Sequence, residues 1–188
     1  MARTWSGEAT IQTRGYVCGY CGFIVSPDKG AVSQDQSSWY IYYCSRCKKP
    51  TFFDGNQNQV PGPMFGEGVQ HVPTDIDKLY NEARKAVSVQ AYTAAVLACR
   101  KVLMNVAVSL QAPEGQSFAS YVEYLSNLGY IPPNGKHWVD HIRTKSNEAN
   151  HEIALMSQEE AQRLITFVQM LLTFIYELPK GVPTPSTP

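Results

Sequence analysis

The chain has 188 residues, of which 44% are hydrophobic and 17% are charged, so it holds enough apolar material for the core of one or two domains. Sixteen basic residues balance sixteen acidic ones. This balance excludes a polybasic protein whose whole surface binds nucleic acid, because such binding depends on an excess of positive charge.

We expect neither export nor a membrane span. The first residues, MARTWS, contain no apolar stretch of the kind found in secretory signals. The most apolar segment, residues 164–178, is shorter than the roughly 20 residues that a spanning helix needs, and it contains Gln169. Five cysteines, four of them in two close pairs, favour metal binding in a reducing compartment over disulfides. The sequence therefore predicts a cytoplasmic protein.

Short strands and turns are predicted for the N-terminal part. Residues 14–53 carry aromatic and β-branched residues in short bursts, separated by Gly, Ser, Pro, Asp and Asn. The predicted strands are residues 22–25, 39–43 and 51–53. Residues 56–73 are rich in Gly, Pro, Gln and Asn, which is typical of a linker. We expect a small domain over residues 1–55, followed by this linker.

Helices are predicted from residue 74 to residue 178. The first begins at Thr74 or Asp75, where a capping side chain precedes apolar positions at helical spacing. The second ends before Pro113. The third begins after Ser117 and stops at Gly129, and the fourth spans about residues 136–153.

The fifth predicted helix begins at Ser157, which forms a capping-box pattern with Glu160. It is apolar on nearly every side through Ile175, so we expect it at the centre of the bundle or at a subunit interface. Residues 179–188 contain four prolines and are predicted to be a disordered tail. The fold class is therefore α+β, with short antiparallel strands followed by an all-α bundle of about five helices.

Four cysteines predict a zinc ribbon. Cys18 and Cys21 form one Cys-x-x-Cys knuckle, and Cys44 and Cys47 form a second. Each knuckle can present two sulfurs to one ion, and four thiolates suit tetrahedral zinc. A site closed by four thiolates leaves no open coordination position, so we expect one structural Zn²⁺ per chain. The alternative is two redox pairs or free core thiols.

Basic residues surround the second knuckle. Arg46, Lys48 and Lys49 lie within or next to it, and several aromatic residues lie nearby in the sequence. Interleaved basic and aromatic groups can bind single-stranded RNA or DNA. Alternatively, the aromatic residues form the ribbon's own small core.

The predicted fourth helix carries a polar stripe. Arg143, Asn147 and His151 are spaced by four residues, so they share one face. Together they could bind a phosphate and transfer a proton near neutral pH. The alternative is a buried polar seam in which these side chains bond to one another or to a neighbouring helix.

The order of these motifs resembles domain-of-unknown-function family 4145. The resemblance rests on the Cys-x-x-Cys ribbon, Tyr80-Asn81-Glu82-Ala83, Tyr92-Thr93-Ala94-Ala95 leading to Arg100, and Ile142-Arg143 followed by Asn147-Glu148-Ala149-Asn150-His151. It covers residues 18–176. Members of that family occur alone or attached to restriction endonucleases and other prokaryotic defence proteins, which implies a bacterial, archaeal or phage source.

The helical part is in turn similar to HEPN domains. These are helical bundles that commonly dimerise and, in active members, cut RNA without a metal. In their signature an Arg precedes a His by about five to seven positions. Here Ser146 stands five positions before His151, and the arginine, Arg143, lies three residues earlier still. The resemblance therefore predicts the fold and a homodimer more directly than it predicts catalysis.

Three functions follow from these observations. The first is a non-catalytic zinc-ribbon and helical module that binds nucleic acid or a partner protein of a prokaryotic or phage defence system. The second is a metal-independent ribonuclease that uses His151 with Arg143 and Asn147. The third is a purely structural subunit of a larger complex.

Overall fold

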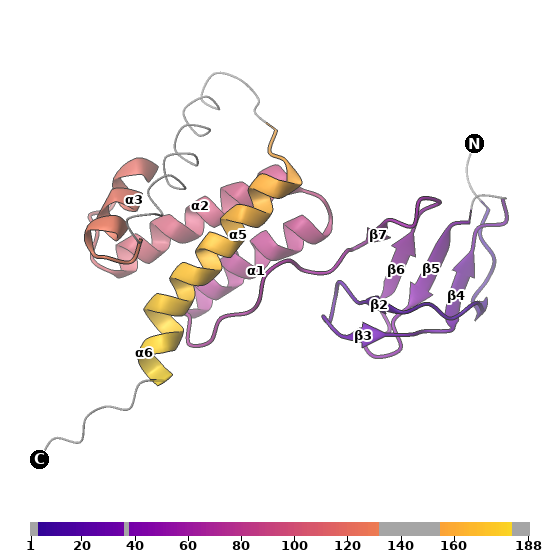
Figure 1. Ribbon diagram of the computed structural model, residues 1–188. Coiled ribbons are helices and arrows are strands. Elements are labelled where there is room, and N and C mark those ends of the chain that lie inside the picture. The colour runs from indigo at the N-terminus through magenta and orange to yellow at the C-terminus, as the bar shows by residue number, and fades with distance from the viewer. Residues whose placement is uncertain (1–3, 36–37, 132–154, 182–188) are drawn as a thin grey trace, which may run out of the picture. The chain divides into compact units, whose positions relative to one another are not determined.

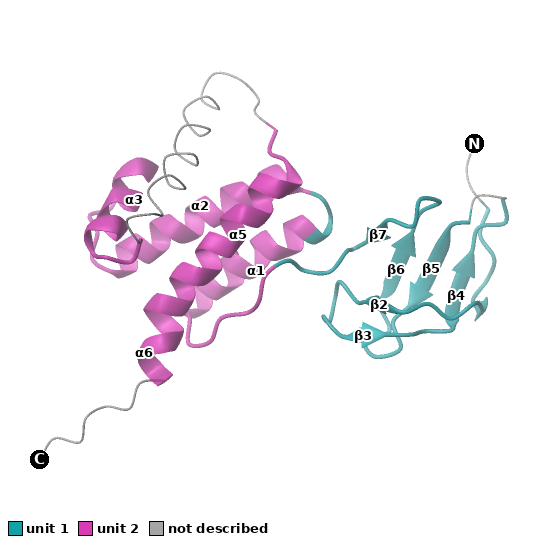
Figure 2. Cartoon of the chain, in the orientation of Figure 1, with its two compact units in different colours: residues 1–65, 88–90 teal, residues 66–87, 91–188 magenta. Residues whose placement is uncertain are grey.

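The computed structural model describes residues 4–35, 38–131 and 155–181 (Figure 1). The chain divides into two compact units, coloured separately in Figure 2: unit 1 comprises residues 1–65 and 88–90, and unit 2 comprises residues 66–87 and 91–188. The strands belong to unit 1, and the helices belong to unit 2 except for the last residue of the first helix. The α+β class predicted from the sequence is thereby confirmed.

Unit 1 consists of a five-stranded antiparallel sheet and a separate two-stranded hairpin. The sheet has the strand order β1-β4-β5-β6-β7, and β2 pairs with β3 in the hairpin. The bounds are Ala9–Thr10 for β1, Tyr16–Val17 for β2, Ile24–Val25 for β3, Lys29–Val32 for β4, Tyr40–Tyr43 for β5, Pro50–Phe53 for β6 and Gln59–Val60 for β7. Figure 1 shows β4, β5 and β6 side by side.

Aromatic rings form the core of unit 1. The ring of Phe53 lies 5.2 Å from that of Tyr16 and 5.7 Å from that of Tyr42, both edge to face. These rings pack with Val25 and with the buried Cys18 and Cys44 in one cluster. Such a core is small, so the cysteines contribute a large share of what holds the unit together.

The sequence located three strands of unit 1 and missed four. The predicted strands 22–25, 39–43 and 51–53 correspond to β3, β5 and β6. The strand β4 begins Lys29-Gly30, a weak strand pattern, yet a side chain at Gly30 would collide with the backbone carbonyl of Ile41. Pairing with β5 therefore decides the conformation of β4. The strand β7 lies within residues 56–73, the segment predicted to be a linker.

Unit 2 is built from α-helices whose apolar sides face one another. The helices are α1 (Thr74–Ser88), α2 (Tyr92–Ser109), α3 (Phe118–Asn127) and α5 (Gln158–Leu172), the last continuing through a π-helical turn (Thr173–Glu177) into α6 (Leu178–Gly181). Helix α2 packs against both α5 and α3. Its buried residues include Cys99, Val102 and Val106, and α5 buries Leu164, Ile165 and Val168.

Helix boundaries in unit 2 follow the capping signals of the sequence. The Ser117 side chain accepts a hydrogen bond from the N–H of Ser120, which opens α3. Both hydrogen bonds of the predicted capping box join Ser157 and Glu160 at the start of α5. The predicted fourth helix, about residues 136–153, lies outside the described residues, and most of the predicted tail does so as well.

Hydrogen bonds tie residues 66–70 to the helices of unit 2. The Tyr80 hydroxyl donates to the carbonyl of Glu67 over 3.0 Å, and the Arg84 guanidinium donates to the carbonyl of Gly66. The side-chain oxygen of Gln169 accepts from the N–H of Glu67 over 2.9 Å. Among the helices that the structure describes, none has both the length and the apolar character required to cross a bilayer.

Candidate metal centre

Two turns bring the four cysteines together. The turn between β2 and β3 carries Cys18 and Cys21, and the turn between β5 and β6 carries Cys44 and Cys47. Their four sulfur atoms all lie within 4.8 Å of one another. The grouping predicted from the sequence is therefore present, and both knuckles contribute to it.

The two knuckles share one backbone pattern. In the first, the N–H of Gly22 donates to the carbonyl of Cys18 over 2.8 Å; in the second, the N–H of Lys48 donates to the carbonyl of Cys44 over 3.0 Å. Gly22 and Lys48 have φ angles of 71° and 64°. A left-handed residue after the second cysteine thus closes each turn, which glycine does freely and lysine only at a cost in conformational energy.

The sulfur geometry fits a zinc ion. The distance between the Sγ atoms is 3.7 Å for Cys18 and Cys47 and 3.8 Å for Cys21 and Cys44. Zinc–sulfur bonds of about 2.3 Å in a tetrahedron place the sulfurs about 3.8 Å apart, whereas a disulfide requires about 2.05 Å. Each measured pair joins one cysteine from each knuckle, so a shared ion would link the two turns.

The protein environment acts on the thiols in opposite directions. Burial raises the pKa of the Cys18 thiol to about 12, despite opposing hydrogen bonds from the backbone N–H groups of Tyr20 and Cys21. Burial also opposes ionisation of Cys44, but hydrogen bonds from the backbone of Cys47 and Arg46 and from neighbouring thiols lower its pKa to about 7. Backbone donors aimed at sulfur suit a thiolate ligand.

The remaining cysteine plays no part in this centre. Cys99 is buried in α2, and burial raises the pKa of its thiol to about 12. A thiol of that kind is protonated at neutral pH and behaves as a small apolar core residue.

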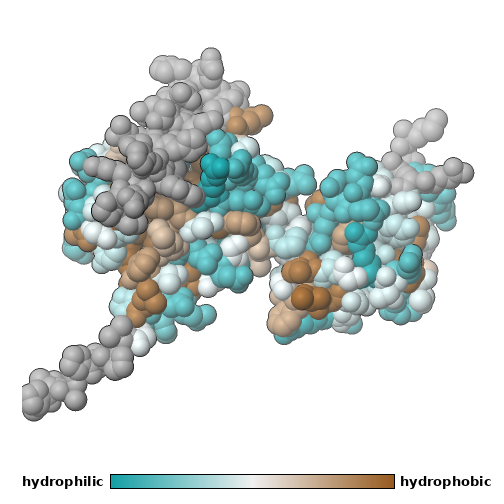
Figure 3. Space-filling model, in the orientation of Figure 1, coloured by the Kyte–Doolittle hydropathy of each residue, from teal (hydrophilic) through white to brown (hydrophobic). Residues whose placement is uncertain are grey.

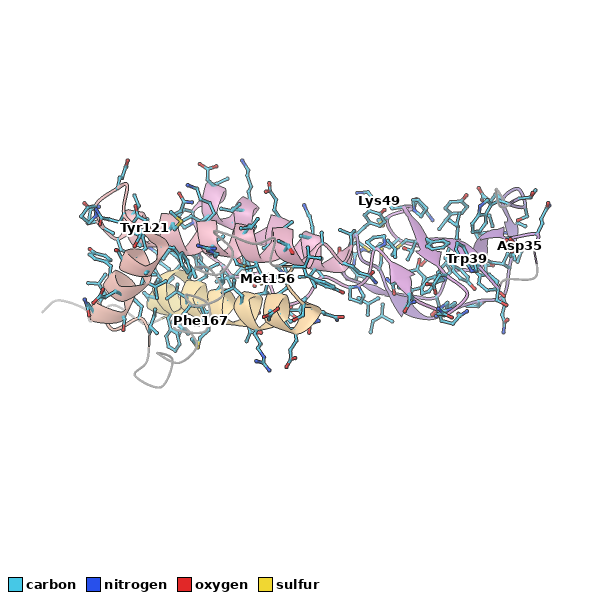
Figure 4. The ribbon with its side chains drawn as sticks, turned by 90° about the horizontal axis from the view of Figure 1, so that it is seen from above. Asp35, Trp39, Lys49, Tyr121, Met156 and Phe167 are labelled. Atoms are coloured by element: carbon cyan, nitrogen blue, oxygen red, sulfur yellow. The ribbon has the colours of Figure 1, made fainter. Side chains whose placement is uncertain are left out.

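Basic side chains of the second knuckle lie against aromatic rings of the first. The guanidinium carbon of Arg46 is 3.1 Å from the ring centroid of Phe23, and the Lys49 ammonium is 5.0 Å from that of Tyr20. The rings remain accessible, with 51% of Phe23 and 43% of Tyr20 exposed. Figure 4 shows Lys49 projecting outward from unit 1. We call Tyr20, Phe23, Arg46 and Lys49 the knuckle surface.

An exposed apolar side chain adjoins the knuckle surface. Ile24, the neighbour of Phe23 in the chain, is 83% exposed. Figure 3 shows apolar surface on unit 1 at the place where Figure 1 draws the turn between β2 and β3. Lys48, also predicted to bind nucleic acid, is exposed, and its ammonium donates to the carbonyl of Ser45 over 2.8 Å.

The sequence did not indicate Phe23 as a site residue, and the predicted polar stripe lies outside the described residues. The signal for Phe23 was its position directly after Cys21-Gly22, at the tip of a knuckle. The structure does not describe Arg143, Asn147 and His151, so their position on one helix face remains a prediction from the sequence. The aromatic residues fall into two groups, since Tyr16, Tyr42 and Phe53 form the core whereas Tyr20 and Phe23 lie at the surface.

One family matches the chain. The sequence model of the family described as Domain of unknown function (DUF4145) matches residues 81–184, which lie within the helical part apart from residues 88–90 of unit 1. The match leaves out the four cysteines. Comparison with curated proteins and with solved structures yields no significant match for the chain.

Proposed function

The chain belongs to the DUF4145 family, a domain of unknown function, and we propose that it is a non-catalytic binding module whose zinc ribbon contacts single-stranded nucleic acid. The observation that carries the proposal is the pairing of Arg46 with the exposed ring of Phe23 on a turn held by the cysteines. We further propose that such a module acts in a prokaryotic or phage defence system.

Cys18, Cys21, Cys44 and Cys47 would hold the zinc ion. Bound there, zinc supplies structural stability and no open coordination position. The two knuckles meet at these sulfurs, at the small aromatic core, and where Arg46 lies over Phe23 and Lys49 over Tyr20. An ion shared by the sulfurs would fix the distance between the Arg46 turn and the Phe23 turn. The knuckle surface is therefore preorganised, which lowers the ordering cost of binding.

The knuckle surface has the chemistry that single strands require. A base stacks on an aromatic ring or on a guanidinium plane whatever its sequence, and an ammonium neutralises a phosphate. Residues 1–65 contain six basic and four acidic side chains, whereas residues 66–188 contain ten basic and twelve acidic side chains. The positive excess of the chain thus lies in the ribbon part, and three of its six basic residues are Arg46, Lys48 and Lys49.

The helical unit has a supporting role in this proposal. Its described helices pack through apolar faces, which is consistent with a HEPN-like bundle, and HEPN-like bundles commonly dimerise. A dimer would present two ribbons to one strand, and two linked sites raise the apparent affinity without any new contact.

Fluorescence anisotropy with a labelled single-stranded 12-mer tests the proposal. We expect Arg46→Gln and Phe23→Leu each to weaken binding at least about fivefold, because stacking one base contributes ~1–3 kcal/mol. Arg46→Gln should also flatten the dependence of log affinity on log salt by about one unit, since one phosphate contact is lost. Zinc content is measured for every variant.

Lys78→Gln is the matched control. Lys78 is an exposed side chain of α1 in unit 2, 3.9 Å from Asp75, so its replacement removes one positive charge far from the knuckle surface in sequence. The affinity of this variant should equal that of the wild type. If the wild type binds no single strand at low salt, or if all three variants lose affinity equally, the proposal is wrong and a protein partner or a structural role takes its place.

A further inference from the structure

A hollow beside the second knuckle has the size of a small-ligand site. It has a volume of about 490 Å³, is open to solvent and is lined by residues of unit 1 that include Glu8, Asp28, Lys29, Tyr43, Ser45 and Lys48. Ligand pockets in proteins span about 300–1,000 Å³. The volume of the hollow lies within that range.

The two lysines of the hollow are partly engaged. The Lys29 ammonium donates to the hydroxyl of Thr10 over 2.5 Å, and the Lys48 ammonium donates to the carbonyl of Ser45 over 2.8 Å. An ammonium has three N–H donors, so each lysine keeps donors for a ligand that carries acceptors or negative charge.

The two carboxylates of the hollow are available as acceptors. Glu8 and Asp28 are exposed, and neither carboxylate forms a hydrogen bond or an ion pair with a residue that the structure describes. A carboxylate accepts from an amino group and repels a phosphate, so these two side chains select a ligand with N–H donors at one end. The lysines provide for a negatively charged group on the same ligand.

The hollow and the knuckle surface share one turn of the chain. Cys44, Ser45 and Lys48 line the hollow, and Arg46, between them, is stacked on Phe23. Tyr43, also in the lining, is half-buried and offers a flat ring edge or face to a base. The cysteine centre fixes the position of this turn, so it positions the wall of the hollow together with Arg46.

We propose that the hollow binds one nucleobase with an exocyclic amino group (cytosine, adenine or guanine) from the strand that the knuckle surface holds. Asp28 and Glu8 accept hydrogen bonds from the amino group, in the way that carboxylates recognise cytosine N4, and Lys29 and Lys48 contact the adjoining phosphate. Thymine and uracil have no exocyclic amino group, and carbonyl acceptors flank their single N3–H donor, so the carboxylates bind them less well. This inference rests on the proposed function and adds base preference to it.

Binding of three labelled homopolymers, dC12, dA12 and dT12, to the whole chain tests the inference. We expect the wild type to bind dC12 and dA12 about tenfold more tightly than dT12, the discrimination of one base-edge contact. In Asp28→Ala the ratio of the affinity for dC12 or dA12 to the affinity for dT12 should fall towards one. The affinity for dT12 itself should stay equal or rise, because the substitution removes a negative charge. A purely electrostatic role of Asp28 would change all three affinities by the same factor.

Glu123→Gln provides the control, since it removes one exposed carboxylate from α3 in unit 2 and should leave the ratio unchanged. If the wild type binds all three strands equally and Asp28→Ala leaves the ratio at one, this inference is overturned and the proposed function stands. If no strand binds, the proposed function itself fails, and the inference fails with it. A preference for dC12 and dA12 that persists in both Asp28→Ala and Glu8→Ala also overturns the assignment of the hollow.

Discussion

The two units of the chain obtain their stability in different ways. In unit 1 the buried cluster consists of Tyr16, Val25, Tyr42 and Phe53 with two cysteines, which is little apolar surface for a domain of this length. In unit 2, α2 and α5 bury aliphatic side chains along their whole lengths. A substitution that unfolds one unit should therefore leave the other almost unchanged.

The largest expected effect is the loss of unit 1 in Cys44→Ser. Replacing one ligand removes most of the zinc affinity, and binding energy of that kind is folding energy in small zinc domains. Metal analysis of the wild type should find about one zinc per chain, and near none in the variant. Hydrogen exchange should then show unit 1 unprotected, while the amides of α2 and α5 keep their protection.

Cys99→Ser is the matched control for the loss of a thiol. It places a hydroxyl in the core of unit 2 without touching the metal centre, so zinc content should stay at one per chain while unit 2 becomes less stable. A Cys44→Ser protein that keeps its zinc and its unit 1 protection would contradict the metal assignment. Loss of zinc in Cys99→Ser would contradict the independence of the two units.

A smaller effect, confined to unit 2, is expected for Ile165→Ala. Ile165 is completely buried on α5, and deletion of a buried Ile side chain costs about 2–5 kcal/mol of unfolding free energy. Chemical denaturation followed by helical circular dichroism measures the loss. Zinc content and the affinity for single strands should not change.

Leu97→Ala is the control for this prediction. Leu97 lies on the same bundle, in α2, but is 57% exposed, so its truncation should change the unfolding free energy by less than about 0.5 kcal/mol. If Ile165→Ala releases zinc, the helical unit supports the ribbon and the comparison above does not hold.

The parts of the fold that the sequence predicted are those decided by local signals. Ser117 and Ser157 mark helix starts because their side chains bond to N–H groups three residues away, and the paired knuckles predict the sulfur cluster because each lies within one turn. A cap and the two cysteines of one knuckle are neighbours in the chain, so their geometry depends little on the rest of the molecule. The joining of the two knuckles does depend on it, because Cys18 and Cys47 are 29 residues apart.

The parts that the sequence missed depend on partners distant in the chain. The strand β4 forms because Gly30 admits the carbonyl of Ile41, and neither residue alone indicates this. Phe23 belongs to the candidate site because Arg46, on the other knuckle, lies over its ring. The hollow combines Glu8 and Asp28 with the second knuckle, and no motif connects residues from three separate segments of the chain.

The smallest expected effect concerns catalysis by unit 2. Under the proposed function, a labelled RNA incubated with the protein in EDTA-free buffer without added metal stays intact, and His151→Ala behaves identically. The physical reason is the spacing, since Arg143 lies eight positions before His151, outside the five to seven positions of the HEPN signature. If the wild type cleaves RNA and His151→Ala does not, while both proteins bind the same zinc and have equal stability, the helical unit is a ribonuclease. The ribbon would then deliver single-stranded RNA to that site, and Arg46→Gln should raise the KM of cleavage without lowering kcat, because the knuckle surface holds the strand equally in the bound and reacting states.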